Sequence, residues 1–228
     1  MEPKVPRRTR EKILALSLRL FNEFGEPNIT TTIIADEMKI SPGNLYYHFR
    51  NKDDIVNSIF VTFEEEMSRM LSVPPGGRPT MQYVWQYLHL MFELIWRYRF
   101  FYRDLSDLLS RNRTLELHFK EIFGHKIKLV KQLCRALQED DALAVNAIEI
   151  DTLSTNMVVT ASYWLSYQYV LNPRKYTEQA VVEKALAGGC YQVLSLMHSY
   201  LRGEALAQFE ELTAKYLKEK SEIAQPSQ

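Results

Sequence analysis

The chain of 228 residues has few of the features that mark several protein classes. It contains only two cysteines, Cys134 and Cys190, which stand far apart and provide neither a disulfide framework nor metal-ligand spacing. No apolar run approaches the ~20 residues that cross a bilayer, and residues 1–10 lack the apolar core of a signal peptide. Lys and Arg number 28, as do Asp and Glu, so net charge does not favour a polyanionic partner. These absences predict a cytoplasmic protein without a membrane segment.

Motifs of catalysis are also missing. The sequence has no Ser/His/Asp or Cys/His grouping, no glycine-rich phosphate loop after a strand, and no HExxH motif. His89 and Glu93, four residues apart in a helical pattern, could ligate a metal, although such a pair is more often a simple polar contact. We therefore expect no catalytic residues, no cofactor and no metal, and a metal-dependent enzyme remains only as an alternative.

Helical periodicity is present throughout, and no convincing strand or repeat interrupts it. With 46% hydrophobic residues the chain can bury a large core. The first helix carries Ile13, Leu16, Leu20 and Phe24 on one face and stops at Gly25. The sequence predicts an all-α fold, with a small three-helix domain at the N-terminus and a larger helical bundle after it.

Residues 29–52 describe two short helices joined by a tight turn. Thr30 is a suitable N-cap for a helix over residues 31–38, and residues 39–40 make the turn. Ser41 caps the next helix, and Pro42 stands at its first position, where the missing N–H costs nothing. This helix-turn-helix arrangement is the geometry that places a helix in the DNA major groove.

The second helix of the pair divides into two faces. Leu45 and Phe49 are four residues apart and face inward. The outward face would be an unusual choice for a helix that met only water, because it combines a glycine with rings and hydrogen-bonding groups. This face comprises Gly43, Asn44, Tyr46, Tyr47 and His48.

These residues resemble the TetR/AcrR family of bacterial transcriptional regulators. The similar positions begin at Arg10 and end near Ile55, and they cover about a fifth to a quarter of the chain. They include Ile13, Leu14, Leu20, Phe21, Gly25, Thr30, Ile34, Ala35, Ser41, Gly43, Leu45, Tyr46, His48, Phe49 and Lys52.

The resemblance implies a bacterial homodimer whose short third helix lies in the major groove of double-stranded DNA. It implies that Gly43 and Tyr46 approach base edges, and that the other contacts go to or beside phosphates. The complete predicted DNA-binding set is Thr31, Thr32, Ser41, Pro42, Gly43, Asn44, Tyr46, Tyr47, His48 and Lys52.

Two positions depart from the usual pattern. Lys39 occupies a turn position that commonly holds a small residue, and Pro42 replaces a residue that is frequently basic. The second change removes a cation from the groove and bears on the operator sequence. The first twelve residues carry five basic and two acidic side chains, so this basic arm either lies along DNA or is a solubilising tail.

We expect a DNA-binding domain over residues 1–52, including the basic arm 1–12, and an effector-binding and dimerisation domain over 53–222. The predicted helices of the second domain cover residues 53–71, 81–96, 105–110, 115–137, 151–171, 177–201 and about 204–220, with Asp151 as an N-cap. The helix over 115–137 exposes Lys126, Lys128, Lys131 and Arg135. Residues 223–228 are expected to form a disordered tail.

An excess of aromatic residues in the second domain indicates a chamber for a small, largely apolar or aromatic ligand, although for any one of them ordinary core packing is the more common role. The predicted ligand-binding set is Trp85, His89, Phe92, Trp96, Phe101, Tyr102, His118, Trp164 and Tyr167.

Small residues inside the helix over 177–201, glycines above all, lower its stability unless another element packs closely against them. That element is either a second subunit or another part of the same chain. Pairing of the helices over 151–171 and 177–201 would form a four-helix dimer interface. The predicted interface set is Ala185, Gly188, Gly189, Tyr191, Leu194 and His198.

Together these features predict a sequence-specific transcriptional regulator, in the first instance a repressor that leaves a near-palindromic operator when a small-molecule effector binds. An all-helical nucleoid-associated protein, or another DNA-binding protein without an effector, stays open as an alternative.

Overall fold

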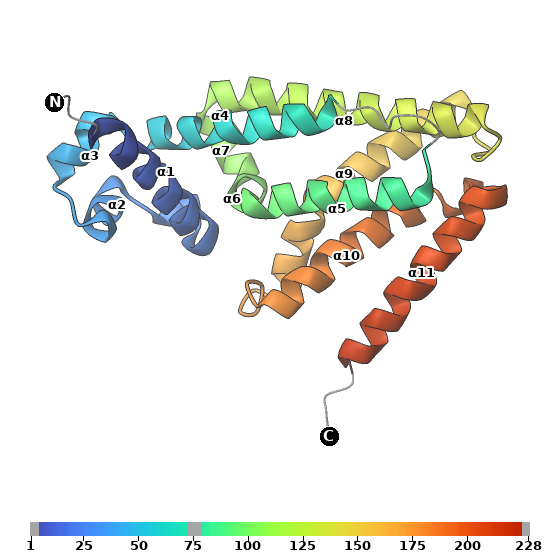
Figure 1. The fold of residues 1–228 in the computed structure, drawn as a ribbon. Helices are drawn as coiled ribbons and strands as arrows, with labels where there is room; N and C mark the ends of the chain where they lie inside the picture. Colours follow the sequence, from blue (N-terminus) through green and yellow to red (C-terminus); the bar gives the residue numbers. More distant parts are fainter. Residues whose placement is uncertain (1–4, 73–78, 225–228) are drawn as a thin grey trace. The chain divides into compact units, whose positions relative to one another are not determined.

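The computed structural model describes residues 5–72 and 79–224, and these ranges form eleven α-helices, two short 3-10 helices and no strand (Figure 1). Leu143 and Leu201 make one isolated antiparallel bridge. The prediction of an all-α fold is confirmed. Within the described residues, no helix is both long and apolar enough to cross a membrane.

Three helices at the N-terminus close a small core. They are α1 (Val5–Phe24), α2 (Thr31–Met38) and α3 (Pro42–His48), with a 3-10 turn at Glu26–Asn28, and each packs on the other two (Figure 1). Ile13, Ile34 and Leu45 are fully buried between them. Residues 5–12 belong to α1, so the described part of the predicted basic arm is helical, while residues 1–4 lie outside the described ranges.

These helices belong to a compact unit that comprises Met1–Ser68 and Tyr98–Glu121. It also contains most of α4 (Lys52–Leu71), α6 (Arg99–Arg103), α7 (Leu105–Arg111) and the first turns of α8 (Arg113–Glu139). Its centre is a cluster of rings in which Phe63 lies 5.5 Å from Phe101 and 5.9 Å from Phe119, measured between centroids.

The second compact unit comprises Arg69–Arg97 and Ile122–Gln228. It contains α5 (Met81–Arg97), the rest of α8, α9 (Ala147–Leu171), α10 (Gln179–Ser195), the 3-10 turn His198–Tyr200 and α11 (Gly203–Ala224). Helix α10 is central here because it packs against α5, α9 and α11 (Figure 1). The residues 223–224 end α11, and the rest of the predicted tail lies outside the described ranges.

Neither unit ends at residue 52, because α6, α7 and the start of α8 join the N-terminal helices in one unit. As a division of function, the boundary at residue 52 stays a prediction. The chain passes between the units within α4, between Arg97 and Tyr98, and within α8.

Helices α9 and α10 differ clearly from their predicted bounds. Helix α9 begins at Ala147, not near Asp151, because Asn146 and Glu149 form a capping box with the backbone N–H groups of one another. Helix α10 is shorter than predicted and covers Gln179–Ser195, since the chain continues as the 3-10 turn His198–Tyr200.

Candidate DNA-binding helix and internal cavity

Local capping sets the geometry of α2 and α3. The Thr30 hydroxyl accepts a hydrogen bond from the Ile33 amide at 3.2 Å, and the Ser41 hydroxyl accepts one from the Asn44 amide at 3.2 Å. Both N-caps are as predicted, with Pro42 at the first turn of α3. Between the helices, Lys39 adopts the left-handed conformation with φ of 55°, which reverses the chain within one residue.

The tyrosines of α3 are open to solvent. Tyr46 is 51% exposed and Tyr47 is 76% exposed, whereas Leu45 and Phe49 are buried. The Tyr46 hydroxyl lies 3.3 Å from the Thr31 hydroxyl, which links the exposed face of α3 to the start of α2. The two-faced pattern predicted from the sequence is therefore present.

Gly43 has no structural reason to be glycine. Its φ does not lie in the left-handed region, and a Cβ placed on it would meet only the Ser41 hydroxyl at 4.0 Å. No side chain therefore covers the backbone of α3 at Gly43, so a binding partner can approach the backbone closely there. Around it, the predicted contact residues Thr32, Ser41, Pro42 and Asn44 are exposed, and Thr31 and His48 are half-buried.

Lys52 is already engaged within the chain. Its Nζ lies 3.0 Å from the Glu26 carboxylate and donates to the Glu26 main-chain carbonyl at 3.0 Å. Glu26 is completely buried and also pairs with Arg111. Lys52 therefore fixes the turn that leads into α2, and this contact was not anticipated from the sequence.

Exposed cations stand at both ends of α3. Lys39 precedes the helix and Arg50 follows it, and both are exposed. Arg10 of α1 donates to the Ser58 hydroxyl at 2.9 Å, and its guanidinium lies 4.9 Å from the centre of the Phe49 ring. The sequence reasoning missed Arg50, although a basic residue directly after the helix was a visible signal.

The nine residues predicted to line one ligand chamber are dispersed. Phe101 and Tyr102 are buried in the ring cluster of the first unit, and there His118 Nδ1 lies 2.6 Å from Glu64 Oε1. In the second unit the Trp96 ring lies 4.8 Å from Tyr176.

The rest of the set also has partners or lies open to solvent. The Trp85 ring lies 6.3 Å from Tyr216, and Tyr167 is 52% exposed. His89 Nε2 lies 3.6 Å from Glu93 Oε1, and within the described residues no group of three or more His, Cys, Asp or Glu side chains could hold a metal. Phe92 and Trp164 pack against Gly189.

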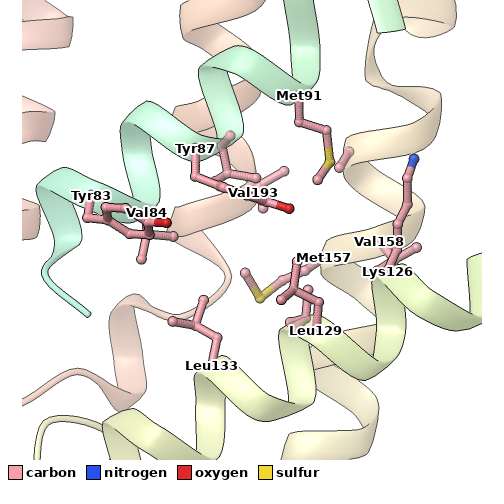
Figure 2. Close-up of a pocket in the computed structure, with 13 residues that line it drawn as sticks. Tyr83, Val84, Tyr87, Met91, Lys126, Leu129, Leu133, Met157, Val158 and Val193 are labelled. Atoms are coloured by element: carbon pink, nitrogen blue, oxygen red, sulfur yellow. The ribbon is translucent and has the colours of Figure 1, made fainter. Parts of the chain in front are cut away.

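The second unit does contain an internal cavity of about 60 Å³, shown in Figure 2. None of the nine predicted residues lines it. The surface of its walls is apolar, and the walls come from α5, α8, α9 and α10. The lining residues are Tyr83, Val84, Tyr87, Leu88, Met91, Lys126, Leu129, Val130, Leu133, Met157, Val158, Ala161 and Val193.

Lys126 corrects one prediction outright. It was expected on the exposed side of its helix, but it is 2% exposed and lines the cavity. Desolvation lowers the pKa of its ammonium to about 7. Its Nζ lies 5.6 Å from the centroid of the Phe123 ring. On the opposite wall, burial and the neighbouring Tyr83 raise the pKa of Tyr87, whose hydroxyl donates to the Met70 carbonyl at 3.0 Å.

The small residues of α10 have an internal neighbour. A Cβ on Gly189 would lie 2.5 Å from Phe92 Cζ and 2.8 Å from Trp164 Cδ1, and one on Gly188 would lie 3.3 Å from Trp164 Cζ2. The Trp164 indole donates to the Ala185 carbonyl at 2.7 Å. Of the two explanations that the sequence left open for these glycines, the internal contact is the one observed.

The other predicted interface residues differ in exposure. Leu194 is buried, Tyr191 is half-buried with its ring 5.0 Å from that of Tyr216, and His198 is exposed. Helix α9, by contrast, has large apolar side chains open to solvent at helical spacing. These side chains belong to Val159, Tyr163, Tyr167 and Val170, and we call them the α9 stripe.

Comparison with known proteins agrees with this geometry. Residues 13–59 match the family described as bacterial regulatory proteins, tetR family, and residues 62–209 match TetR, described as a bacterial transcriptional repressor. A crystal structure of a TetR-family transcriptional regulator from Marinobacter aquaeolei VT8 is similar over 91% of this chain and 98% of that one, with 33% identity and a TM-score of 0.82.

More distant relatives are consistent. The HTH-type transcriptional regulator HbdR of Aromatoleum sp. (strain CIB) is 34% identical over 74 residues, and the match spans 31% of this chain and 32% of HbdR. The TetR family protein CprB from S. coelicolor A3(2) shares the fold, with 15% identity, a TM-score of 0.63, and coverage of 93% of this chain and 98% of CprB. HbdR and the Marinobacter protein are transcriptional regulators and not enzymes. The chain belongs to the TetR family of bacterial transcriptional regulators, in its DNA-binding repressor class.

Proposed function

We propose that this protein is a homodimeric repressor that holds a near-palindromic operator through α3 and releases it when a small molecule occupies the second unit. The observation that carries the proposal is the exposed tyrosine face of α3, held rigidly over a closed three-helix core. Because its target is chromosomal DNA, we propose the cytoplasm as its place of action.

In this proposal α3 enters the major groove with its N-terminal end foremost. Bare backbone at Gly43 allows close approach to a base edge, while Tyr46 and Tyr47 supply rigid rings with hydroxyls that reach bases or phosphates. The partial positive charge at the start of α3 favours a phosphate. Lys39 and Arg50, at the two ends of the helix, are better placed for phosphates than the engaged Lys52.

The test is a gel mobility shift on DNA selected from a random pool by the wild-type protein. We expect Tyr46→Ala to weaken binding at least tenfold, which corresponds to about 1.4 kcal/mol, without changing the dimer. Val61→Ala, an exposed apolar position on α4, is the matched control and should bind normally. Undiminished binding by Tyr46→Ala would overturn the assignment of α3.

The selected DNA also tests symmetry. A homodimer that holds its two α3 helices about one DNA turn apart (~34–36 Å) should recover an inverted repeat. Many unrelated recovered sequences without symmetry would instead favour the alternative of a nucleoid-associated protein.

For dimerisation we propose the α9 stripe as the centre of the contact. Its four apolar side chains are open to solvent, whereas the small residues of α10 are occupied by Phe92 and Trp164 of the same chain. A homodimer needs an apolar core in its interface, and such a stripe provides one. Light scattering should report a dimer for the wild type and a monomer for Tyr163→Asp, while Thr152→Asp, exposed nearer the N-terminal end of the same helix, should remain dimeric.

Release of DNA needs a ligand that binds one arrangement of the dimer better than the other, because a ligand of equal affinity shifts nothing. The cavity between α5, α8, α9 and α10 is the site we propose for it, since it lies within the second unit and is lined by side chains from four helices. Small displacements of these helices would alter the spacing of the two α3 helices.

A further inference from the structure

The cavity between α5, α8, α9 and α10 is lined by apolar surface alone. Most of its walls come from Val, Leu, Met and Ala side chains. Tyr83, Tyr87 and Lys126 also line it, and because the wall surface is apolar, they contribute rings and a methylene stem to it. Their polar atoms therefore do not face the cavity.

The polar atoms of two of these residues have partners of their own. The Tyr87 hydroxyl donates to the Met70 carbonyl at 3.0 Å, so only the ring is left to close the wall. Lys126 is already engaged within the chain. The wall that the described residues form thus offers a ligand neither a hydrogen-bond donor nor an acceptor.

We propose that this cavity binds a compact, uncharged hydrocarbon that carries no group able to form hydrogen bonds. The proposal deepens the proposed function and rests on it only in taking the cavity as the effector site. A hydroxyl, amine or carboxylate brought against this wall would lose its water and find no partner. Apolar surface has no such partner to lose, and it gains free energy when it leaves water.

The same wall is a poor site for water, because a buried water molecule needs roughly two to four polar partners. An apolar ligand therefore competes with no tightly held water when it enters. In another protein, an engineered apolar cavity of ~150 Å³ binds benzene or xenon for the same reasons.

The size of the cavity limits the ligand further. At about 60 Å³ it has room for a xenon atom, whereas a six-membered ring requires lining side chains to move. Figure 2 shows Met91 and Met157 among these side chains, the first from α5 and the second from α9. Methionine changes rotamer readily because it is unbranched and flexible, so we expect these two residues to make room for a small ring.

Isothermal titration calorimetry of the full chain without DNA tests the proposal with toluene, phenol and aniline. The three probes share one ring and differ in a single substituent, which is a methyl, a hydroxyl or an amino group. We expect toluene to bind roughly tenfold or more tightly than either polar probe, because their hydrogen-bonding groups would be left unpaired. Titrations at two temperatures guard against a vanishing heat at one of them, since burial of apolar surface changes the heat capacity.

Matched variants locate the site. Ala161→Val adds two methyl groups to the cavity wall and should weaken toluene binding roughly tenfold or more. Val193→Ala enlarges the cavity and should bind toluene roughly threefold or more tightly than the wild type. Ala207→Val, at an exposed position of α11, is the control and should bind toluene like the wild type. Circular dichroism of each variant verifies folding.

The proposal is overturned if phenol or aniline binds as tightly as toluene, if toluene does not bind, or if Ala161→Val and Val193→Ala both bind toluene like the wild type. Failure of the regulator assignment is a separate result, because it would appear as absent DNA binding in the mobility shift while calorimetry without DNA still reported on the cavity.

Discussion

Replacing Gly189 with alanine is a direct test of the packing of α10, because among the glycines of the described ranges a Cβ would meet the closest atoms here. The added Cβ would lie 2.5 Å from Phe92 Cζ, 2.7 Å from Phe92 Cε2 and 2.8 Å from Trp164 Cδ1. Phe92 is 1% exposed and has no space to retreat, so the insertion overpacks the core at a cost of about 1–3 kcal/mol. The better helix propensity of alanine offsets about 1 kcal/mol of this cost, and we expect a net loss of up to about 2 kcal/mol.

Two other helical glycines provide matched controls. At Gly124 in α8 a Cβ would meet nothing within 4 Å, so Gly124→Ala should gain about 1 kcal/mol from propensity alone. At Gly188 the nearest atoms lie at 3.3 Å, and the two effects should nearly cancel. The expected order of stability is therefore Gly124→Ala above Gly188→Ala above Gly189→Ala.

Urea denaturation followed by circular dichroism, at one fixed protein concentration, measures these differences, since association would shift the midpoints. A second substitution, Phe92→Leu, should recover part of the loss caused by Gly189→Ala and reveal coupling between the two positions. If Gly189→Ala were as stable as Gly124→Ala, the close internal contact would not exist and the reasoning about α10 would be wrong.

Three further predictions concern other parts of the chain. The pKa of Lys126 is about 7 in the folded protein and ~10.4 in the unfolded chain, so the unfolded state binds more protons between these pH values. The free energy of unfolding should therefore rise with pH in this window, by at most about 1.4 kcal/mol per pH unit. Urea titrations at pH 7, 8 and 9 should show this slope for the wild type and not for Lys126→Met. Lys39→Gly should raise the thermal midpoint, since the left-handed conformation at φ of 55° costs lysine roughly 1 kcal/mol more than glycine, and an unchanged or lower midpoint would count against this. Glu26→Gln should destabilise the fold by about 3 kcal/mol, because it removes the carboxylate that faces Lys52 and Arg111 in a buried setting; a calorimetric scan that matched the wild type would contradict it.

Local features of this protein could be predicted from its sequence, whereas distant contacts could not. Thr30, Ser41 and Pro42 act on residues two or three positions away, so their capping roles follow from the order of residues alone. The same holds for the inward position of Leu45 and the outward position of Tyr46, because helical periodicity determines them.

The ligand-binding residues were predicted from their residue type, and residue type alone does not show in which hydrophobic core a side chain lies. Phe101 and Phe92 are both buried phenylalanines, yet the first belongs to the ring cluster of one unit and the second packs on Gly189 in the other. The sequence pattern placed Lys126 on the exposed side of its helix together with Lys128 and Arg135, and the structure finds only the latter two exposed. Only the packing of α5 and α9 on α8 shows that this lysine is buried, and that contact lies far away in the sequence.

The buried carboxylate of Glu26 has a mechanical consequence for the first unit. It receives Lys52 from the start of α4 and Arg111 from the end of α7, and the Glu26 amide donates to Asp104 at 3.0 Å. Arg103 in turn donates to the Phe21 carbonyl at 2.7 Å, at the end of α1. Sliding α7 against the three N-terminal helices would separate these charges from their partners, so we expect the elements that they join to move together as one rigid block.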